Sequence, residues 1–285
     1  MNTGLRRAAG SAQWLLVGAA AAAHALLTAL AAAEYAWLGW LLDTGYDLAA
    51  VTLVLVSAAS GLAASALVAA RAAAGYRGLR RLARESSRPL PSAIQAAVAT
   101  LGLAGHVQAV TATEPFAVTV GLVRPRILVS DRLAGALSRA ELTAVLAHER
   151  CHLLHRDPAR LLAVRMLAAY AWYLPAARWL AGRAALNREL AADRAALTGA
   201  GRGVLAGALL KLAALPACPA VAAASPERNP AGSLEARVTQ LEQGRPARPR
   251  LAAGRALASA GGLMLLAAAG LCCVGLSAAL PAGVL

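Results

Sequence analysis

Three long runs without a charged residue constrain the fold of this chain more than any other feature. Residues 11–33, 48–70 and 256–280 contain no Asp, Glu, Lys or Arg. An α-helix crosses the hydrocarbon core of a bilayer with about 20 apolar residues, and each run reaches that length. A hydrophobic content of 59% is outside the usual range of soluble proteins. We therefore expect three transmembrane helices in a multi-pass protein of the cell membrane.

The first of these runs has a second possible interpretation. Arg6 and Arg7 precede it, as basic residues precede the apolar core of a signal peptide. The run is long for a signal peptide, however, and a second apolar run follows almost at once. We therefore interpret residues 11–33 as a membrane anchor.

The charges beside the apolar runs predict the topology. The segment between the first two runs carries three acidic residues and no basic one, namely Glu34, Asp43 and Asp47. Arginines cluster after the second run and before the third: Arg71, Arg77, Arg80, Arg81, Arg84, Arg88, Arg245, Arg248, Arg250 and Arg255. Because basic residues favour the cytoplasmic side of a membrane, we expect the region between these two clusters to be cytoplasmic.

This topology divides the chain into three parts. Residues 1–70 hold two transmembrane helices and a short external loop, 71–254 form a cytoplasmic domain, and 255–285 hold a C-terminal transmembrane helix. The net charge of +14 could also indicate nucleic-acid binding. Because the arginines flank the apolar runs and no aromatic pattern accompanies them, we expect contact with the lipid bilayer and no direct binding of nucleic acid.

Two local patterns predict structure inside the cytoplasmic domain. Residues 115–130 contain two short β-branched runs separated by Gly121 and Pro125, which indicates a small β-hairpin. Ser138, with Glu141 three residues later, has the spacing of a capping box. The helix that it begins should continue through His152 and end near Asp157.

On that helix lies the sequence His148-Glu149-Arg150-Cys151-His152, an H-E-x-x-H motif. Its two histidines are four residues apart, so both imidazoles lie on one helical face and can bind a single zinc ion. Glu149 would lie beside them as the general base that accepts a proton from the attacking water. The pattern therefore predicts a zinc-dependent peptidase.

A catalytic zinc ion normally has three protein ligands and an open position for water. The variant of the motif with a third histidine would place that ligand at position 158, which is a proline. Glu189 and Asp193 lie downstream, four residues apart on a second predicted helix. We expect Glu189 to be the third ligand and Asp193 to orient a ligand histidine. The alternative is a charged helical face, because arginines lie next to both carboxylates.

Residues 160–182 separate the two predicted ligand helices and are almost apolar enough to form a fourth transmembrane helix. Such a helix would place Glu189 across the membrane from His148. Arg165, Arg178 and Pro175 interrupt the segment, and we expect a buried or membrane-dipping helical hairpin. The fold class is therefore mainly α, with transmembrane helices flanking an α+β domain that contains a small β-hairpin or sheet.

From about Pro115 to Leu241 the chain resembles the BlaR/MecR-type membrane metallopeptidases. The resemblance rests on the segments 121–127, 142–158, 172–175 and 189–193, which include the H-E-x-x-H motif and Trp172-Tyr173-Leu174-Pro175. It implies a gluzincin-type domain, with one zinc ion held by His148, His152 and Glu189 and with Glu149 as the motif glutamate. It also implies a bacterial plasma membrane protein that cleaves a cytosolic target, commonly a DNA-binding repressor.

The resemblance has limits, and two other functions remain open. The best-known members have four spans and a penicillin-binding sensor after the last one, whereas three spans are predicted here and the chain stops at Leu285. A β-lactam ligand is therefore not implied. One alternative is a membrane quality-control protease of the HtpX type, which uses the same set of ligands. The other is a non-catalytic membrane receptor or scaffold with a structural zinc ion.

Overall fold

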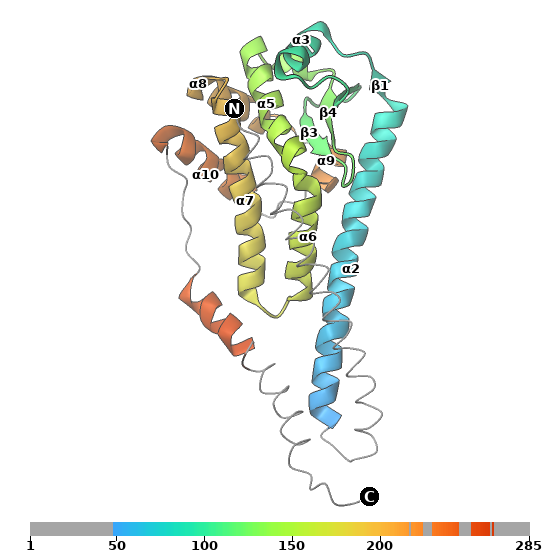
Figure 1. The fold of residues 1–285 in the computed structure, drawn as a ribbon, viewed down its shortest axis with the longest axis vertical. Helices are drawn as coiled ribbons and strands as arrows, with labels where there is room; N and C mark the ends of the chain where they lie inside the picture. The colour runs from blue at the N-terminus through green and yellow to red at the C-terminus, as the bar shows by residue number, and fades with distance from the viewer. Residues whose placement is uncertain (1–47, 217, 225–229, 245–251, 263, 265–285) are drawn as a thin grey trace, which may run out of the picture. The chain divides into compact units, whose positions relative to one another are not determined.

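The computed structural model describes residues 48–216, 218–224, 230–244, 252–262 and 264. They are mainly helical with one small mixed sheet (Figure 1). The described residues divide into two compact units. Unit 1 contains the described parts of 1–66, 165–179 and 251–285, and unit 2 contains the described parts of 67–164 and 180–250.

The elements follow one another along the chain as α2 (Leu48–Glu85), β1 (Ser87–Arg88), α3 (Ser92–Leu101), β2 (Val107–Val110), β3 (Ala117–Val120), β4 (Arg126–Ser130), α4 (Leu133–Ala136), α5 (Arg139–His155), α6 (Asp157–Tyr170), α7 (Pro175–Leu197), α8 (Arg202–Ala213), α9 (Pro219–Ala224) and α10 (Pro230–Gln243). Residues 253–262 are also helical.

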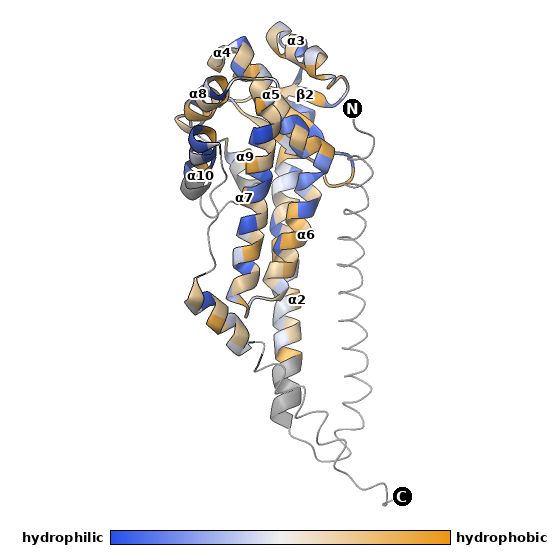
Figure 2. Cartoon of the chain, turned by 60° about the vertical axis from the view of Figure 1, so that its left-hand side comes forward, coloured by the Kyte–Doolittle hydropathy of each residue, from blue (hydrophilic) through white to orange (hydrophobic). Residues whose placement is uncertain are grey.

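Helix α2 corresponds to the second predicted transmembrane run and continues beyond it to Glu85. Within the described part of the chain, its segment Leu55–Glu85 is the one helix long and apolar enough to cross a membrane. Beyond its first turns, which are grey, α2 carries residues drawn in pale and orange shades (Figure 2). The predicted run 11–33 lies outside the described residues, and so does most of the run 256–280.

In unit 1, close contacts join α2 to the C-terminal end of α6 and to the turn that follows it. The indole nitrogen of Trp172 donates a hydrogen bond to Ser60 Oγ at 2.9 Å, and Ser65 Oγ donates to the Met166 carbonyl at 2.9 Å. A side chain at Gly61 would begin 2.6 Å from the carbonyl oxygen of Tyr170. A glycine is therefore needed where the two backbones approach.

Unit 2 is built around a four-stranded sheet with the order β1-β2-β4-β3. Strands β3 and β4 are antiparallel, with Ala117 opposite Val129 and Val120 opposite Arg126, so the predicted hairpin is confirmed. Strand β2 pairs with β4 in parallel, and β1 with β2 in antiparallel fashion. The short strands β1 and β2 were not predicted.

Both faces of this sheet are covered, as Figure 1 shows for α5 and the C-terminal part of α2. Ile127 and Val129 of β4 pack with α3 and α5 in one apolar cluster. Leu128 points to the opposite face and packs with Leu79 of α2 and Phe116. Because successive side chains of a strand alternate between faces, a central strand buried on both sides is a continuous apolar run.

Helix α5 begins where the sequence predicts it. Ser138 is the N-cap and accepts a hydrogen bond from the Glu141 backbone, while the Glu141 side chain accepts one from the backbone of Ser138. The helix ends at Arg156, which has a left-handed conformation with φ 51°. The chain then turns directly into α6. Helix α5 contacts strands β3 and β4 of the sheet and also helix α8.

The segment 160–182 forms the expected helical hairpin. Helices α6 and α7 are joined by a tight turn over residues 171–174, in which the Leu174 amide donates to the Ala171 carbonyl at 2.9 Å. Pro175 begins α7, where the missing amide hydrogen costs no helical bond. Helix α7 then runs to Leu197 and brings Glu189 and Asp193 into unit 2.

Candidate metal centre and peptidase site

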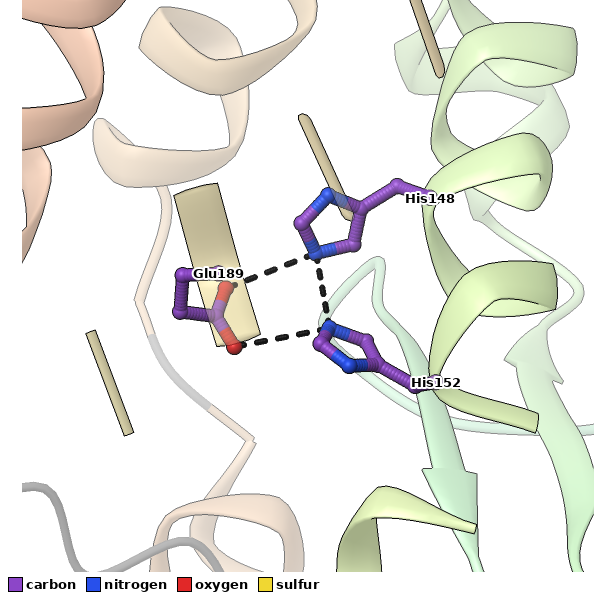
Figure 3. Close-up of side chains that lie close together, drawn as sticks. All are labelled: His148, His152 and Glu189. Carbon is purple, nitrogen blue, oxygen red and sulfur yellow. Dashed lines mark hydrogen bonds and ion pairs between the residues drawn. The ribbon is translucent and has the colours of Figure 1, made fainter. Parts of the chain in front are cut away.

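The two motif histidines lie on adjacent turns of α5 and point toward α7. His148 Nε2 and His152 Nε2 are 3.0 Å apart, and the two rings meet edge to face. The carboxylate of Glu189 on α7 faces both, with Oε2 3.4 Å from His148 Nε2 and Oε1 3.4 Å from His152 Nε2 (Figure 3). The structure thus brings the three predicted ligands together.

The spacing of these atoms fits a single metal ion. The three candidate ligand atoms lie within 4.8 Å of one another. With bond lengths of about 2.0–2.2 Å, a tetrahedral zinc ion separates its N and O ligands by about 3.3–3.6 Å. The observed separations of 3.0, 3.4 and 3.4 Å are close to those values. Two imidazoles and one carboxylate are also a typical ligand set for catalytic zinc.

Asp193 lies beside His148, as the sequence analysis expects. Its Oδ1 is 2.9 Å from His148 Nδ1, in an ion-pair contact that departs from regular hydrogen-bond geometry. Asp193 is fully buried. Burial opposes ionisation of this carboxyl, but its contacts with His148 and Arg237 lower the pKa of Asp193 below its usual value.

Asp157 has the same place beside His152, a role that the sequence analysis did not predict. His152 Nδ1 donates to Asp157 Oδ2 at 2.8 Å. The other oxygen of Asp157 accepts a short hydrogen bond from Arg188 of α7. Each candidate ligand histidine is therefore oriented by a carboxylate, which directs its Nε2 toward the shared site.

Arg237 of α10 is the second residue that the sequence analysis missed. It donates to both oxygens of Asp193, from Nε and Nη2, at 2.7 Å each. Its Nη1 lies 3.3 Å from Glu189 Oε2. Arg188 and Arg194 also have partners outside α7, namely Asp157 and Gln240. These contacts across elements argue against the alternative of a charged helical face with pairs inside one helix.

The predicted general base, Glu149, is a residue of α5, and its carboxylate lies next to β3, an edge strand of the sheet. Its Oε2 is 2.7 Å from Thr119 Oγ1, which is also 3.0 Å from the backbone carbonyl of Glu149. Both side chains are buried. Thr119 thus holds the Glu149 carboxylate in one orientation beside the histidines, and the alternating pattern of the β3 strand could have indicated that Thr119 faces α5.

The protonation of the site follows from this crowding of charges. Burial alone would lower the pKa of His148, but its contacts with Asp193 and Glu189 outweigh that effect and raise the pKa to about 9. Burial raises the pKa of Glu189, yet His148, His152 and Arg237 together bring it down to about 2. Without a metal ion, His148 therefore binds a proton at neutral pH, in the place where a metal cation would bind.

Two neighbouring residues of α5 have structural contacts. His155 Nδ1 lies 2.8 Å from the Cys151 carbonyl oxygen, one turn earlier in the helix. Burial raises the pKa of the Cys151 thiol to about 11, so this cysteine is protonated at neutral pH. Neither residue is part of the group of candidate ligands.

The comparison with protein families agrees with this geometry. Residues 43–241 match the family described as BlaR1 peptidase M56, a span that contains α5, α7 and Arg237. The chain belongs to the BlaR1 peptidase M56 family. Comparison with curated proteins finds no significant match. Membership implies a peptidase that uses a metal, and together with the apolar helix α2 it indicates a membrane protein.

Proposed function

We propose that the chain is a membrane-embedded zinc metalloendopeptidase that cleaves a cytosolic protein, such as a transcriptional repressor, in signal transduction. The proposal rests on the convergence of His148, His152 and Glu189 within 4.8 Å in a chain of this peptidase family. The family resemblance also supports a cytosolic protein as the substrate. The N-terminal and C-terminal apolar runs would anchor the domain in the plasma membrane.

In this proposal His148, His152 and Glu189 hold one zinc ion per chain. Bound there, zinc supplies Lewis acidity that acidifies a water molecule and polarises the scissile carbonyl group. Glu149 accepts the proton of the attacking water and later transfers it to the leaving amine. Thr119 keeps the Glu149 carboxylate in place through the 2.7 Å contact.

Strand β3 is suited to align an extended substrate. It lies at the edge of the described sheet. The carbonyl of Phe116, the residue before β3, accepts a hydrogen bond from the Ser130 amide of β4 at 2.9 Å. Because hydrogen-bonded pairs alternate in an antiparallel ladder, the backbone groups of Ala117 and Thr119 point away from β4. A substrate segment added there would run next to Glu149.

The first experiment measures zinc content and peptide-bond cleavage for the purified wild type and Glu149→Gln in detergent. We expect one zinc ion per chain in both proteins. Cleavage of a fluorogenic peptide library should fall by at least about 10²-fold in Glu149→Gln, because the amide cannot accept the proton. Full turnover in the variant would contradict the role of Glu149.

Zinc content, measured together with the cleavage of protein substrates, separates the two alternative functions. Cleavage of many unfolded membrane proteins by the wild type, without preference for one cytosolic target, would favour a quality-control protease. Zinc in both proteins with cleavage in neither would favour a receptor or scaffold with a structural metal ion. The absence of zinc from both would contradict the proposed metal centre.

A further inference from the structure

Arg237 connects α10 to the two carboxylates of α7 that surround the ligand histidines. Its partner Asp193 lies 44 positions earlier in the chain, and the guanidinium donates to both oxygens of that carboxylate. The planar guanidinium suits this two-point contact, which fixes the plane of the carboxylate as well as its distance. One side chain of α10 therefore determines the orientation of a buried acid on α7.

The same guanidinium also contacts the candidate ligand. Glu189 Oε2 is shared by Arg237 Nη1 at 3.3 Å and His148 Nε2 at 3.4 Å. The other oxygen, Oε1, faces His152 Nε2 at 3.4 Å. Arg237 therefore touches both the carboxylate that would bind the metal and the carboxylate that orients His148.

We propose that Arg237 is a positioning residue of the metal centre, and that its guanidinium holds Glu189 and Asp193 in the orientation in which His148, His152 and Glu189 bind zinc together. The inference rests on the proposed function, because it concerns the affinity of the same site for zinc. It adds a third element, α10, to the two helices that carry the ligands.

A simple electrostatic argument predicts the opposite effect. A cation beside the site repels a divalent cation, so a neutral residue at position 237 would strengthen zinc binding. The charge of Arg237 is, however, already balanced by Glu189 and Asp193. Removing it would deprive Asp193, which is fully buried, of the two hydrogen bonds from Arg237 and leave its contact with His148. We therefore expect the loss of orientation to outweigh the loss of repulsion.

A second alternative is that Arg237 only docks α10 onto α7. Another contact between these helices offers a matched control. Arg194 Nη1 donates to Gln240 Oε1 at 2.9 Å, and Gln240 Nε2 donates to the Leu190 carbonyl at 3.0 Å. Arg194→Ala removes a contact between α7 and α10 without removing a group that touches Glu189 or Asp193.

The test measures the zinc dissociation constant of the full chain in detergent by competition with a chromophoric chelator. The proteins are the wild type, Arg237→Gln, Arg237→Lys and Arg194→Ala. Arg237→Gln should bind zinc about 10- to 100-fold more weakly. Arg237→Lys should be intermediate, because it keeps the charge and loses the two-point contact. Arg194→Ala should stay within about twofold of the wild type.

The visible absorption of the cobalt-substituted proteins gives an independent measurement of the ligand arrangement. We expect a changed spectrum in both Arg237 variants and the wild-type spectrum in Arg194→Ala. Thermal unfolding shows whether Arg237→Gln folds. If it does not, the test depends on Arg237→Lys, for which we expect an intermediate zinc affinity and a changed spectrum.

Several results would overturn the inference. Tighter zinc binding by Arg237→Gln would favour the electrostatic argument, and an equal loss in Arg194→Ala would favour mere docking of α10. A wild-type protein that binds zinc no more tightly than the Arg237 variants refutes the role of Arg237 and leaves the metal centre intact. A wild-type protein that binds no zinc refutes the proposed function itself.

Discussion

At the scale of single residues, the candidate site consists of two parallel chains of contacts. One runs from His148 through Asp193 to Arg237, and the other from His152 through Asp157 to Arg188. In each, a buried carboxylate lies between an imidazole and a guanidinium. A carboxylate next to Nδ1, in an ion-pair contact for His148 and a hydrogen bond for His152, leaves Nε2 of the same ring free for a metal ion. Both histidines are thereby prepared for coordination through Nε2.

This arrangement predicts that zinc and protons compete for His148. In the metal-free protein the pKa of His148 is raised to about 9 from an ordinary value of 6.5. Below pH 9 the ring must therefore lose a proton before it can bind zinc. We expect the apparent zinc affinity to rise roughly tenfold per pH unit between pH 6.5 and 9 for this one proton. Chelator competition at several pH values measures it.

The stability of the metal-free protein should show the opposite trend. Because the folded-state pKa of His148 is above the unfolded value of 6.5, the protonated ring stabilises the fold fully below that pH. This stabilisation is lost as the pH rises through about 9. Thermal unfolding in the presence of a chelator should therefore show a falling Tm over this range. A zinc affinity and a Tm that are both independent of pH would contradict the pKa shift.

The two carboxylates differ in how far the sequence predicts them. Asp193 lies one helical turn after Glu189, so regular helix geometry places it near the same partners. Asp157 lies beyond the end of α5, and it reaches His152 only because Arg156 takes a left-handed conformation and turns the chain. Arg237 depends on the packing of α10 against α7, which no local pattern predicts.

At the scale of elements, local signals predict the helices better than the sheet. The capping box at Ser138 and Glu141 predicts where α5 begins, and Pro175 interrupts the apolar segment where α6 and α7 are separated by a turn. Strand β1 has two residues and β2 has four, and β2 pairs with β4 in parallel. Such short, non-local pairing leaves little periodic pattern in the sequence.

The contact between α2 and the C-terminal end of α6 predicts different effects for two glycines of α2. A β-carbon at Gly61 would meet the Tyr170 backbone at 2.6 Å, whereas nothing lies within 4 Å of one at Gly78. Gly61→Ala should therefore destabilise the protein by about 1–3 kcal/mol. Gly78→Ala should stabilise it by up to about 1 kcal/mol, because alanine is the better helix former. Thermal unfolding in detergent compares the two.

The two substitutions control for each other, because both replace a glycine with alanine inside α2. An equal change in Tm for both would mean that the close approach of Gly61 and Tyr170 does not contribute to stability. A loss for Gly61→Ala alone would support the packing of the C-terminal end of α6 against α2 within unit 1.

At the scale of the whole molecule, the hairpin of α6 and α7 determines whether the site can form. The histidines precede the turn of this hairpin and Glu189 lies after the turn, on α7, so all three can meet only if the chain returns to the side from which it started. A fourth transmembrane helix over residues 160–182 would separate them. The turn at 171–174 provides that return.

This requirement predicts that positions before and after the hairpin lie on one side of the membrane. Arg124 and Gln243 are exposed, the first in the β3–β4 loop and the second at the end of α10. In a variant without the four native cysteines, Arg124→Cys and Gln243→Cys should both react with an impermeant maleimide only after permeabilisation, as a cytoplasmic domain requires. Asp43→Cys, between the first two apolar runs, should react in intact cells. Reaction of Arg124→Cys and Gln243→Cys from opposite sides would mean that residues 160–182 cross the membrane, and the three ligands could not then share a metal ion.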